Sequence, residues 1–271
     1  MHFKQVLGAA SLMTMAALLP SQLSATNAYD LAVLALNPVA YYTFSNLTGT
    51  TISDVTGNGH DGTISGGYTL GVAGPLAGAT GATFNGSDAV VVVPGVWGGT
   101  PAITVIAWYQ TVPGVTGPRA IVGGNGVEYV NLQTATASGS GSSGVFTDTG
   151  SVSPTLAPAT TPTGWHMVVL SATSGAIDEY IDGVQVYSNA KTFNTVAPTL
   201  AANGVHIGGV GNTLRRFDGT ISDVALFNTA LSATDVSNLY TVAGPLITPE
   251  PASGALAAAA LVGFLAFRRG R

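Results

Sequence analysis

The sequence of 271 residues has no cysteine and few charged side chains. Without cysteine it can form neither a disulfide framework nor a thiolate metal site. Asp and Glu outnumber Lys and Arg by 13 to 8, and only four basic residues lie between positions 29 and 248: Arg119, Lys191, Arg215 and Arg216. Binding to a phosphate backbone needs clustered cations. Nucleic acid is therefore not an expected partner.

Signals for α-helices are scarce as well, and runs of strand length dominate the chain. These runs are rich in β-branched and aromatic residues and are separated by Gly, Pro, Asn and Asp. In residues 103–111 apolar side chains fall on both faces, which predicts a strand covered on both sides. Asp182-Gly183 predicts a hairpin turn. The expected strands lie at 39–45, 89–94, 103–111, 126–134, 165–173, 179–188, 205–209 and 218–228.

Two short helices are expected beside these strands, one within residues 29–38 and one within residues 231–240. In the second, Ser232 is expected as the N-cap, and Asp235 completes a capping box. Many strands and few helices predict an all-β fold, either a two-sheet sandwich or a jelly roll.

The segment 134–164 is rich in Gly, Ser, Thr and Pro. We interpret it as a decorated loop around one strand near Val145-Phe146, and a flexible interdomain linker is the alternative. No second core that would need a linker is evident, so a single domain of about 220 residues is expected between the two ends of the chain.

The N-terminus is predicted to be a secretory signal peptide covering residues 1–28. A short basic start is followed by a mainly apolar run of 14 residues from Val6 to Leu19, and small residues lead to Ala28. This order is typical of a signal peptide, here cleaved after Ala28. An uncleaved membrane helix is the alternative, but 14 residues are fewer than the roughly 20 that a span needs.

The C-terminal segment, residues 248–271, has three parts. A Pro-Glu-Pro triplet comes first, a mainly apolar run of 16 residues from Ala252 to Phe267 follows, and an arginine cluster ends the chain. As a helix the run would extend about 24 Å, just short of a typical hydrocarbon core. Cations after a span hold that end in the cytoplasm, which would leave the domain outside. The residues expected to act in sorting and processing are Pro249, Glu250, Pro251, Arg268, Arg269 and Arg271.

This three-part ending is similar to the PEP-CTERM sorting signal of Gram-negative bacteria. A permanent anchor has no need of two prolines, which keep the segment extended and stop a helix from entering it. The resemblance implies that an exosortase is a partner and removes the tail at the inner membrane, where the protein is held transiently. It also implies that the protein then reaches the cell surface or the exopolysaccharide matrix.

Between the two ends, six motifs follow one another in a recognisable order. They are "YDLAVLALNPVAYYTFSN" (29–46), "DVTGNGHDGTI" (54–64), "GATFNGSDAVVVVP" (81–94), "ITVIAWYQT" (103–111), "GWHMVVLSATSGAIDEYIDGVQV" (164–186) and "FDGTISDVALFNTALSATDVSNLY" (217–240). The ordered set resembles the laminin-G-like domains of the concanavalin A-like lectin/glucanase group. That resemblance implies a two-sheet jelly-roll sandwich over residues 29–247, with an N-terminal signal helix before it and a C-terminal hydrophobic helix after it.

One loop has the oxygen-rich composition that calcium favours. In "DVTGNG" (54–59), Asp54 and Asn58 offer oxygen ligands between glycine bends. The resemblance implies that the first and last strands lie close together, so Asp223 is expected to add a carboxylate. A Ca²⁺ site of Asp54, Asn58 and Asp223 is one interpretation, and an Asx-turn that satisfies only its own backbone is the other. Relatives often have an acidic residue just after the first strand, and "SNLTG" has none.

Sugar binding through stacking needs an exposed aromatic ring. Trp108 and Trp165 lie within apolar strands and are expected in the core, whereas Trp97 lies in a loop and is the candidate ligand-binding residue. The alternative for Trp97 is a side chain folded onto the edge of the sandwich.

Relatives that hydrolyse β-glucans have two glutamates flanking an aspartate on one strand, which places acid and nucleophile on one side of the sugar. Before the tail this chain has only Glu128 and Glu179, and neither begins such a pattern. Asp178, Glu179 and Asp182 are interpreted as a solvated hairpin edge, and His166 as a packed or hydrogen-bonded histidine. We therefore expect no catalytic residues.

The function expected from the sequence is that of an exported, non-catalytic surface or matrix protein that binds carbohydrate or exopolysaccharide. A glycan-active hydrolase or lyase of the same fold is the alternative.

Overall fold

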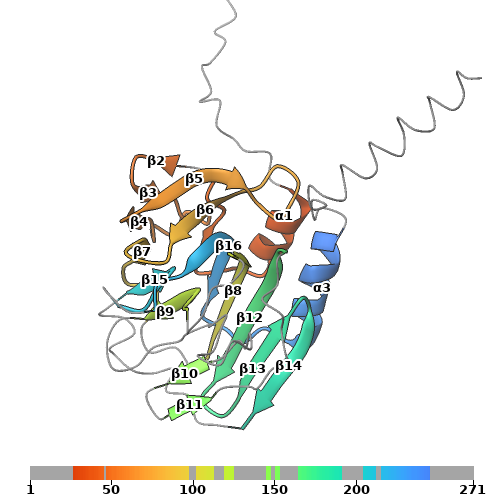
Figure 1. The fold of residues 1–271 in the computed structure, drawn as a ribbon. Coiled ribbons are helices and arrows are strands. Elements are labelled where there is room, and N and C mark those ends of the chain that lie inside the picture. The colour runs from red at the N-terminus through yellow and green to blue at the C-terminus, as the bar shows by residue number, and fades with distance from the viewer. Residues whose placement is uncertain are drawn as a thin grey trace, which may run out of the picture.

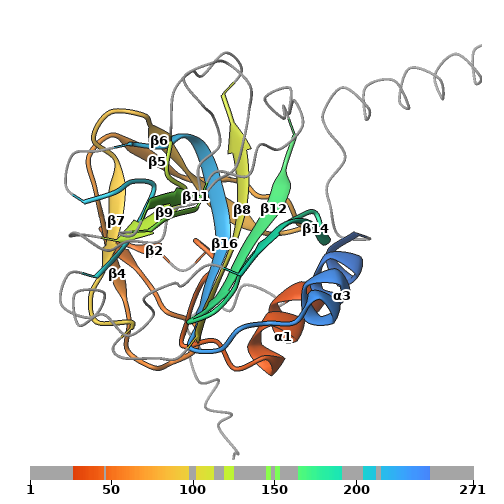
Figure 2. The same ribbon diagram turned by 90° about the horizontal axis from the view of Figure 1, so that it is seen from below.

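The β-branched runs form two antiparallel sheets that face each other, and two helices cover the outer face of the larger sheet. Figure 2 shows the three layers: the smaller sheet with β7 and β9, the larger sheet with β16, β8 and β12, and then α1 and α3. The computed structural model describes residues 27–45, 47–97, 102–112, 119–124, 145–147, 150–152, 164–190, 204–211 and 215–244.

The larger sheet has eight strands, seven of them in one path and β1 paired beside β16. In spatial order they are β14 (Val184–Asn189), β13 (Ile177–Ile181), β12 (His166–Thr173), β8 (Ala102–Thr111), β16 (Asp218–Phe227), β6 (Thr80–Asn85) and β5 (Tyr68–Ala73), with β1 (Ala40–Tyr42). Figure 1 shows this order across the molecule.

The smaller sheet has six strands and packs on the inner face of the larger one. Its order is β2 (Leu47–Thr48), β3 (Thr51–Ile52), β4 (Gly62–Ser65), β7 (Val90–Val93), β15 (Val205–Ile207) and β9 (Val122–Gly124). A separate hairpin pairs β10 (Val145–Thr147) with β11 (Gly150–Val152). The strand expected near Val145-Phe146 therefore exists.

Strand β16 is the central strand of the larger sheet because it pairs with three others. Along one edge it pairs with β8. Along the other it pairs first with β6, up to Ile221, and then with β1, from Val224 onward. The register shifts between Ser222 and Ala225, where the partner changes, and Asp223 lies in this bulge with φ +50°.

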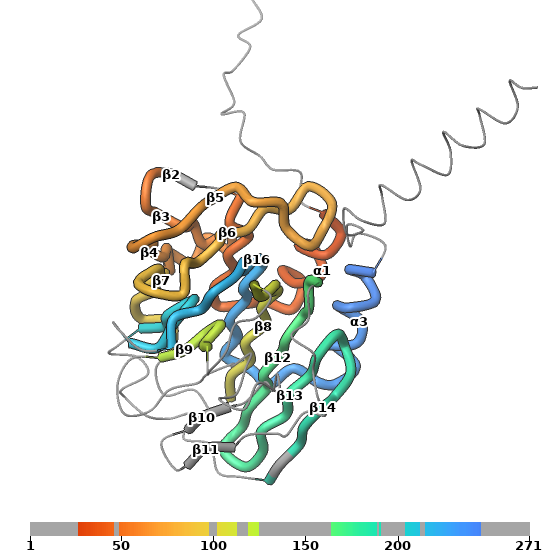
Figure 3. The backbone as a smooth tube through the Cα atoms, in the orientation of Figure 1, coloured from red at the N-terminus to blue at the C-terminus, as the bar shows by residue number. Residues whose placement is uncertain are grey.

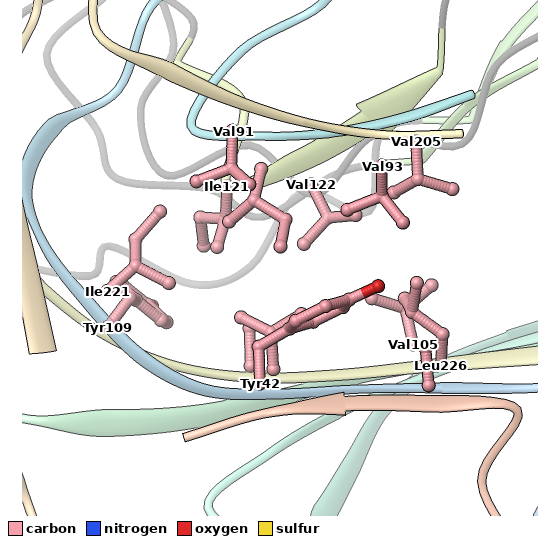
Figure 4. Close-up of a cluster of buried hydrophobic side chains, with 14 of the residues drawn as sticks. Tyr42, Val91, Val93, Val105, Tyr109, Ile121, Val122, Val205, Ile221 and Leu226 are labelled. Atoms are coloured by element: carbon pink, nitrogen blue, oxygen red, sulfur yellow. The ribbon is translucent and has the colours of Figure 1, made fainter. Parts of the chain in front are cut away.

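The main core lies between the two sheets. In Figure 4, Val91, Val93 and Val205 from the smaller sheet face Tyr42, Val105, Tyr109 and Leu226 from the larger one. Apolar side chains of this size contribute about 1.5–3 kcal/mol each when fully buried, so this layer is the main source of stability in a chain without disulfides.

A second core lies between the larger sheet and the helices. Trp108, fully buried, contacts Tyr29 of α1 edge-on at 5.9 Å between ring centroids and stacks on Tyr240 of α3 at 6.1 Å. Its neighbours on β8, Ala107 and Tyr109, point into the other core. The prediction that this strand is covered on both sides is confirmed.

Both helices begin with a capping box. Helix α1 (Ala28–Ala35) is capped by Asn27 with Asp30, and α3 (Ala233–Ala243) is capped by Ser232 with Asp235. The predicted cap of the second helix is confirmed. The cap of the first involves Asn27, which precedes the expected cleavage after Ala28, so cleavage there would remove the cap and the first helical residue.

The order of elements along the chain agrees with the predicted strands wherever the two overlap. The Asp182-Gly183 turn joins Ile181 to Val184, and both turn residues have positive φ, +51° and +79°. Figure 3 shows that the first and last elements, α1 and α3, end up beside each other. The expected strand at 126–134, residues 1–26 of the predicted signal peptide and the predicted tail segment lie outside the described residues.

Neither helix that the structure describes has the length and apolar character that a membrane crossing requires.

Candidate functional site

A pocket of about 420 Å³ lies where the end of α1, the loop after β3 and the end of β16 meet. This volume is within the range of small-ligand sites. The pocket has three asparagines, two threonines and three apolar residues: Leu34, Asn37, Pro38, Val39, Thr56, Asn58, Asn228 and Thr229. None of these residues is charged. The polar side chains are amides and hydroxyls, which can both donate and accept hydrogen bonds.

The first wall is the C-terminal end of α1. The helix ends because Asn37 takes a left-handed conformation, with φ +55°, and Pro38 follows it. Asparagine tolerates this conformation better than most residues, and proline cannot continue a helix. The Leu36 and Asn37 amides still donate to carbonyl groups of the last turn, at 3.1 and 3.0 Å. The exposed side chain of Asn37 therefore extends from a fixed backbone position at the pocket.

The second wall is the loop that Asp54 organises. Its Oδ1 accepts from the Tyr41 amide (3.0 Å) and from the amide and hydroxyl of Thr56 (3.0 and 2.7 Å), and its Oδ2 accepts from the His60 amide (3.3 Å). All of these partners are donors, so the group acts as an ionised carboxylate does. Asp54 therefore forms an Asx-turn that fastens the loop to β1.

Asn58 lies exposed in the same loop. Its Nδ2 donates to the Val39 carbonyl at 3.0 Å, and its backbone amide donates to the Thr56 hydroxyl at 3.2 Å. The Asn58 side chain therefore lies across the residues just before β1, and its N–H group donates to the protein's own backbone.

The third wall follows β16 directly. Asn228 and Thr229 are exposed, and the Thr229 carbonyl accepts from the Thr104 hydroxyl at 2.7 Å. This anchored backbone holds the Asn228 amide and the Thr229 hydroxyl at the pocket, together with the residues at the C-terminal end of α1. Sequence reasoning missed Asn37, Asn228 and Thr229. The available signals were an asparagine before proline at a helix end and an Asn-Thr pair between a buried strand and a capped helix.

Asp223 lies beneath α1, buried to 1% exposure. Its Oδ1 is 3.2 Å from the Tyr41 hydroxyl, which also contacts Asp30 at 2.7 Å. Its Oδ2 is 2.5 Å from the Ser222 hydroxyl, which also contacts the Thr80 carbonyl at 2.7 Å. The Ser222 hydroxyl thus has one proton and two acceptors within reach, the Thr80 carbonyl and Asp223 Oδ2. A proton on Asp223 allows both contacts to be hydrogen bonds at once, with Ser222 donating to Thr80 and accepting from Asp223.

The neutral acid is therefore the form of Asp223 that satisfies both contacts of Ser222. Burial favours the same form: it is the main cause that raises the pKa of Asp223 to about 7, with the Asp30 carboxyl contributing and the hydrogen bonds from Ser222 and Tyr41 opposing it. Burial also raises the pKa of Asp30. Without a cation beside it, a carboxyl in this position is more stable with its proton on.

The structure does not bring the three predicted calcium ligands into one site. Asp54 accepts from the backbone amide of Tyr41, whereas Asp223 contacts the phenol hydroxyl of the same residue. Asn58 is turned toward Val39. Within the part of the chain that the structure describes, no group of three or more His, Cys, Asp or Glu residues is placed to hold a metal ion.

Trp97 is 2% exposed and belongs to the core between the sheets. The prediction of an exposed aromatic platform at this position is wrong, because the loop folds inward and the indole fills the sandwich. Trp108 is in the core, as predicted, and Trp165 is partly buried against the helix-side core.

A second group of polar side chains lies on the larger sheet near the turn after β13. The His166 Nδ1 is 2.5 Å from Asp182 Oδ2, and Asp182 Oδ1 accepts from the Met167 amide at 2.9 Å. Tyr109 lies 6.1 Å from His166, ring to ring. The prediction of a hydrogen-bonded histidine is confirmed. The interpretation of Glu179 as solvated is wrong, since it is fully buried.

Basic side chains of the described residues gather at the other end of β16 from the pocket. Arg215 and Arg216 immediately precede this strand, and the Arg119 guanidinium donates to the Arg216 carbonyl at 3.0 Å. Burial lowers the pKa of Arg216. The predicted sorting residues of the tail, positions 249–251 and 268–271, lie outside the described residues.

Comparison with known proteins gives a family and several similar folds. The family model described as "Concanavalin A-like lectin/glucanases superfamily" matches residues 84–237, which is more than half of the chain. No curated protein matches the sequence.

Three solved structures illustrate the likeness. Domain 4 of AbnA, a GH43 extracellular arabinanase from Geobacillus stearothermophilus, was solved with arabinotriose; it shares 22% identity over 75% of this chain and 98% of that domain, at a TM-score of 0.57. The binding domain of Paraclostridial Mosquitocidal Protein 1 shares 14% sequence identity over 76% of this chain and 52% of that one, at a TM-score of 0.56. Trypanosoma rangeli sialidase shares 15% sequence identity over 74% of this chain and 32% of that one, at a TM-score of 0.55. The chain thus spans about half of the second protein and a third of the third, and likeness at these identities concerns the fold alone.

Proposed function

The chain belongs to the concanavalin A-like lectin/glucanases superfamily, and from this premise we propose that it is a non-catalytic carbohydrate-binding protein. The observation that carries the proposal is the pocket beside α1, which is lined by amides and hydroxyls on a rigid frame. Such groups match sugar hydroxyls, which donate and accept in the same way. A similar domain of an arabinanase, solved with arabinotriose, supports this choice of ligand class.

The alternative is a glycan-active enzyme, and Glu179, Asp182 and His166 are the residues on which it would depend. Glycoside hydrolysis by two carboxyl groups requires that both reach the sugar. Glu179 is fully buried, and Asp182 uses both oxygens in hydrogen bonds to His166 and Met167. This arrangement favours the binding function over the catalytic one.

Binding is tested on the full chain, purified in mild detergent, with a glycan array followed by titration calorimetry. Arabinotriose and arabinan are the first probes. Asn228→Trp places a large ring in the exposed wall of the pocket and is expected to weaken binding at least roughly tenfold, because filled pockets exclude ligand. Gln185→Trp, on the exposed strand β14, is the matched control and should bind as the parent does. A protein that binds no glycan, or an Asn228→Trp variant with full affinity, contradicts the proposal.

We further propose that the protein is exported and sorted by an exosortase to the surface or matrix of a Gram-negative bacterium. The support is the sequence of the two ends: an apolar N-terminal run, and a Pro-Glu-Pro triplet before a short apolar run and an arginine cluster. The inner membrane would then hold the protein only until the tail is cut.

Calcium binding at the Asp54 turn also stays a proposal. Its support is the oxygen-rich loop, in which Asn58 is exposed and lines the pocket. Calorimetric titration of chelator-stripped protein tests it, and the absence of heat at millimolar calcium would contradict it.

A further inference from the structure

Resting on the proposed function, we propose that the pocket beside α1 selects neutral glycans and rejects glycans that bear carboxylate or sulfate groups. The selection comes from the charges around the pocket rather than from its shape.

The lining has no cation with which to bind an acidic sugar. Its polar side chains are Asn37, Thr56, Asn58, Asn228 and Thr229. Proteins that recognise carboxylates and sulfates use arginine or lysine, often as a two-pronged contact. Two of the polar groups are also committed as donors, since Thr56 donates to Asp54 and Asn58 donates to Val39. The capacity that remains to them is mainly that of acceptors, which suits a hydroxyl and repels an anion.

The groups directly behind the lining add negative potential. The Asp54 carboxylate lies 2.7 Å behind the Thr56 hydroxyl and is almost completely buried. The end of α1 at the pocket is its C-terminus, where the helix dipole is negative. An acidic sugar in the pocket would meet both, and like charges placed together across an interface cost several kcal/mol.

The arginines of the described residues lie too far away to offset this potential. Arg215 and Arg216 precede β16, and Asn228 follows it, so the whole ten-residue strand lies between them. A strand of that length spans about 33 Å. At physiological ionic strength charges are screened over about 8 Å, so the arginines have little influence at the pocket.

The experiment compares glycans that share a backbone and differ chiefly in charge. Affinity is measured by calorimetry for three pairs: dextran and carboxymethyl dextran, hydroxyethyl cellulose and carboxymethyl cellulose, and methyl-esterified and de-esterified polygalacturonate. We expect the neutral member of at least one pair to bind and its acidic partner to bind at least roughly tenfold more weakly. The affinity for the neutral member should not change with salt, because no ion pair contributes to it.

Charge variants separate the field at the pocket from the net charge of the protein. Asn228→Lys is expected to raise the affinity for the acidic member at least roughly tenfold, because it places a cation in the wall. Gln185→Lys makes the same change in net charge on the distant strand β14 and should leave the preference as it is.

The outcomes distinguish this inference from the proposed function. An acidic glycan that binds the parent protein as well as or better than its neutral partner, or an equal effect of the two lysine variants, overturns the inference and leaves carbohydrate binding intact. A protein that binds no glycan, on these pairs or on the array, overturns both.

Discussion

Replacing Asp223 by asparagine is expected to stabilise the protein at neutral and alkaline pH. Asparagine has nearly the same shape as the neutral acid. Its amide nitrogen can donate to Ser222, and its oxygen can accept from Tyr41, so it keeps the hydrogen bonds described above. It differs in one respect, because it cannot ionise. Asp223→Asn therefore removes the cost of a buried charge beneath α1 and leaves the packing as it is.

The magnitude follows from the pKa of the carboxyl group. Burial raises it from 3.8 to about 7, so the folded protein holds this proton more tightly than the unfolded chain does. Stability is then lost as the pH rises from about 4 to about 7, and the loss is complete above that. Three pH units correspond to an upper limit of about 4 kcal/mol. The parent protein should lose part of this stability between pH 5 and pH 8, and the variant should not.

Urea unfolding followed by tryptophan fluorescence, at intervals from pH 4.5 to 8.5, measures the effect. The advantage of the variant over the parent in free energy of unfolding should grow by up to about 3 kcal/mol between pH 5 and pH 8, because about two of the three pH units lie above pH 5. Asp178→Asn is the control, because Asp178 lies in the β13–β14 hairpin and its contact with Gln185 survives the change. Parallel pH profiles for the parent and Asp223→Asn, or a variant less stable at pH 8, would refute the reasoning.

Three further predictions concern the helices and the tail. In the uncleaved chain, Asn27→Ala removes the cap of α1 and should lower the free energy of unfolding by about 1 kcal/mol, whereas Asn27→Ser should retain most of it. Gly183→Ala forces a Cβ to within 2.8 Å of Tyr240 at φ +79°, so it should destabilise by more than about 1 kcal/mol; Gly175→Ala, which meets no atom within 4 Å, is its control in thermal unfolding. Mass spectrometry of surface-located protein should find a C-terminus near residues 249–251, and an intact Arg271 there would make the tail a permanent anchor.

The fold was predictable because local patterns and packing agree in this chain. The β-branched runs, the Asp182-Gly183 turn and the Ser232 capping box each determine their own local structure, and none needs distant information. The two-sided strand 102–111 was recognisable because both of its faces are apolar. The bulge at Asp223 was not, since it arises where β16 exchanges one partner strand for another.

The candidate site was harder to predict because it is built from residues far apart in the sequence. Asn37 and Asn228 meet at one pocket only after β1 pairs with β16, and a single asparagine in a loop predicts nothing about its neighbours. Trp97 shows the opposite error: a tryptophan in a glycine-rich loop suggested exposure, and the loop turns it into the core. Glu179 likewise is next to a turn in sequence but on the buried face of its strand.

The pairing of α1 with α3 has a mechanical consequence. The described chain enters through one of these helices and leaves through the other, and both lie on the same outer face of the larger sheet (Figure 1). A pull between the two ends therefore acts first on the contacts that dock the helices, while the sandwich beneath is bypassed. The strand network would be loaded only after a helix had peeled away, so a tethered molecule could lose its helix layer under tension and regain it when the tension falls.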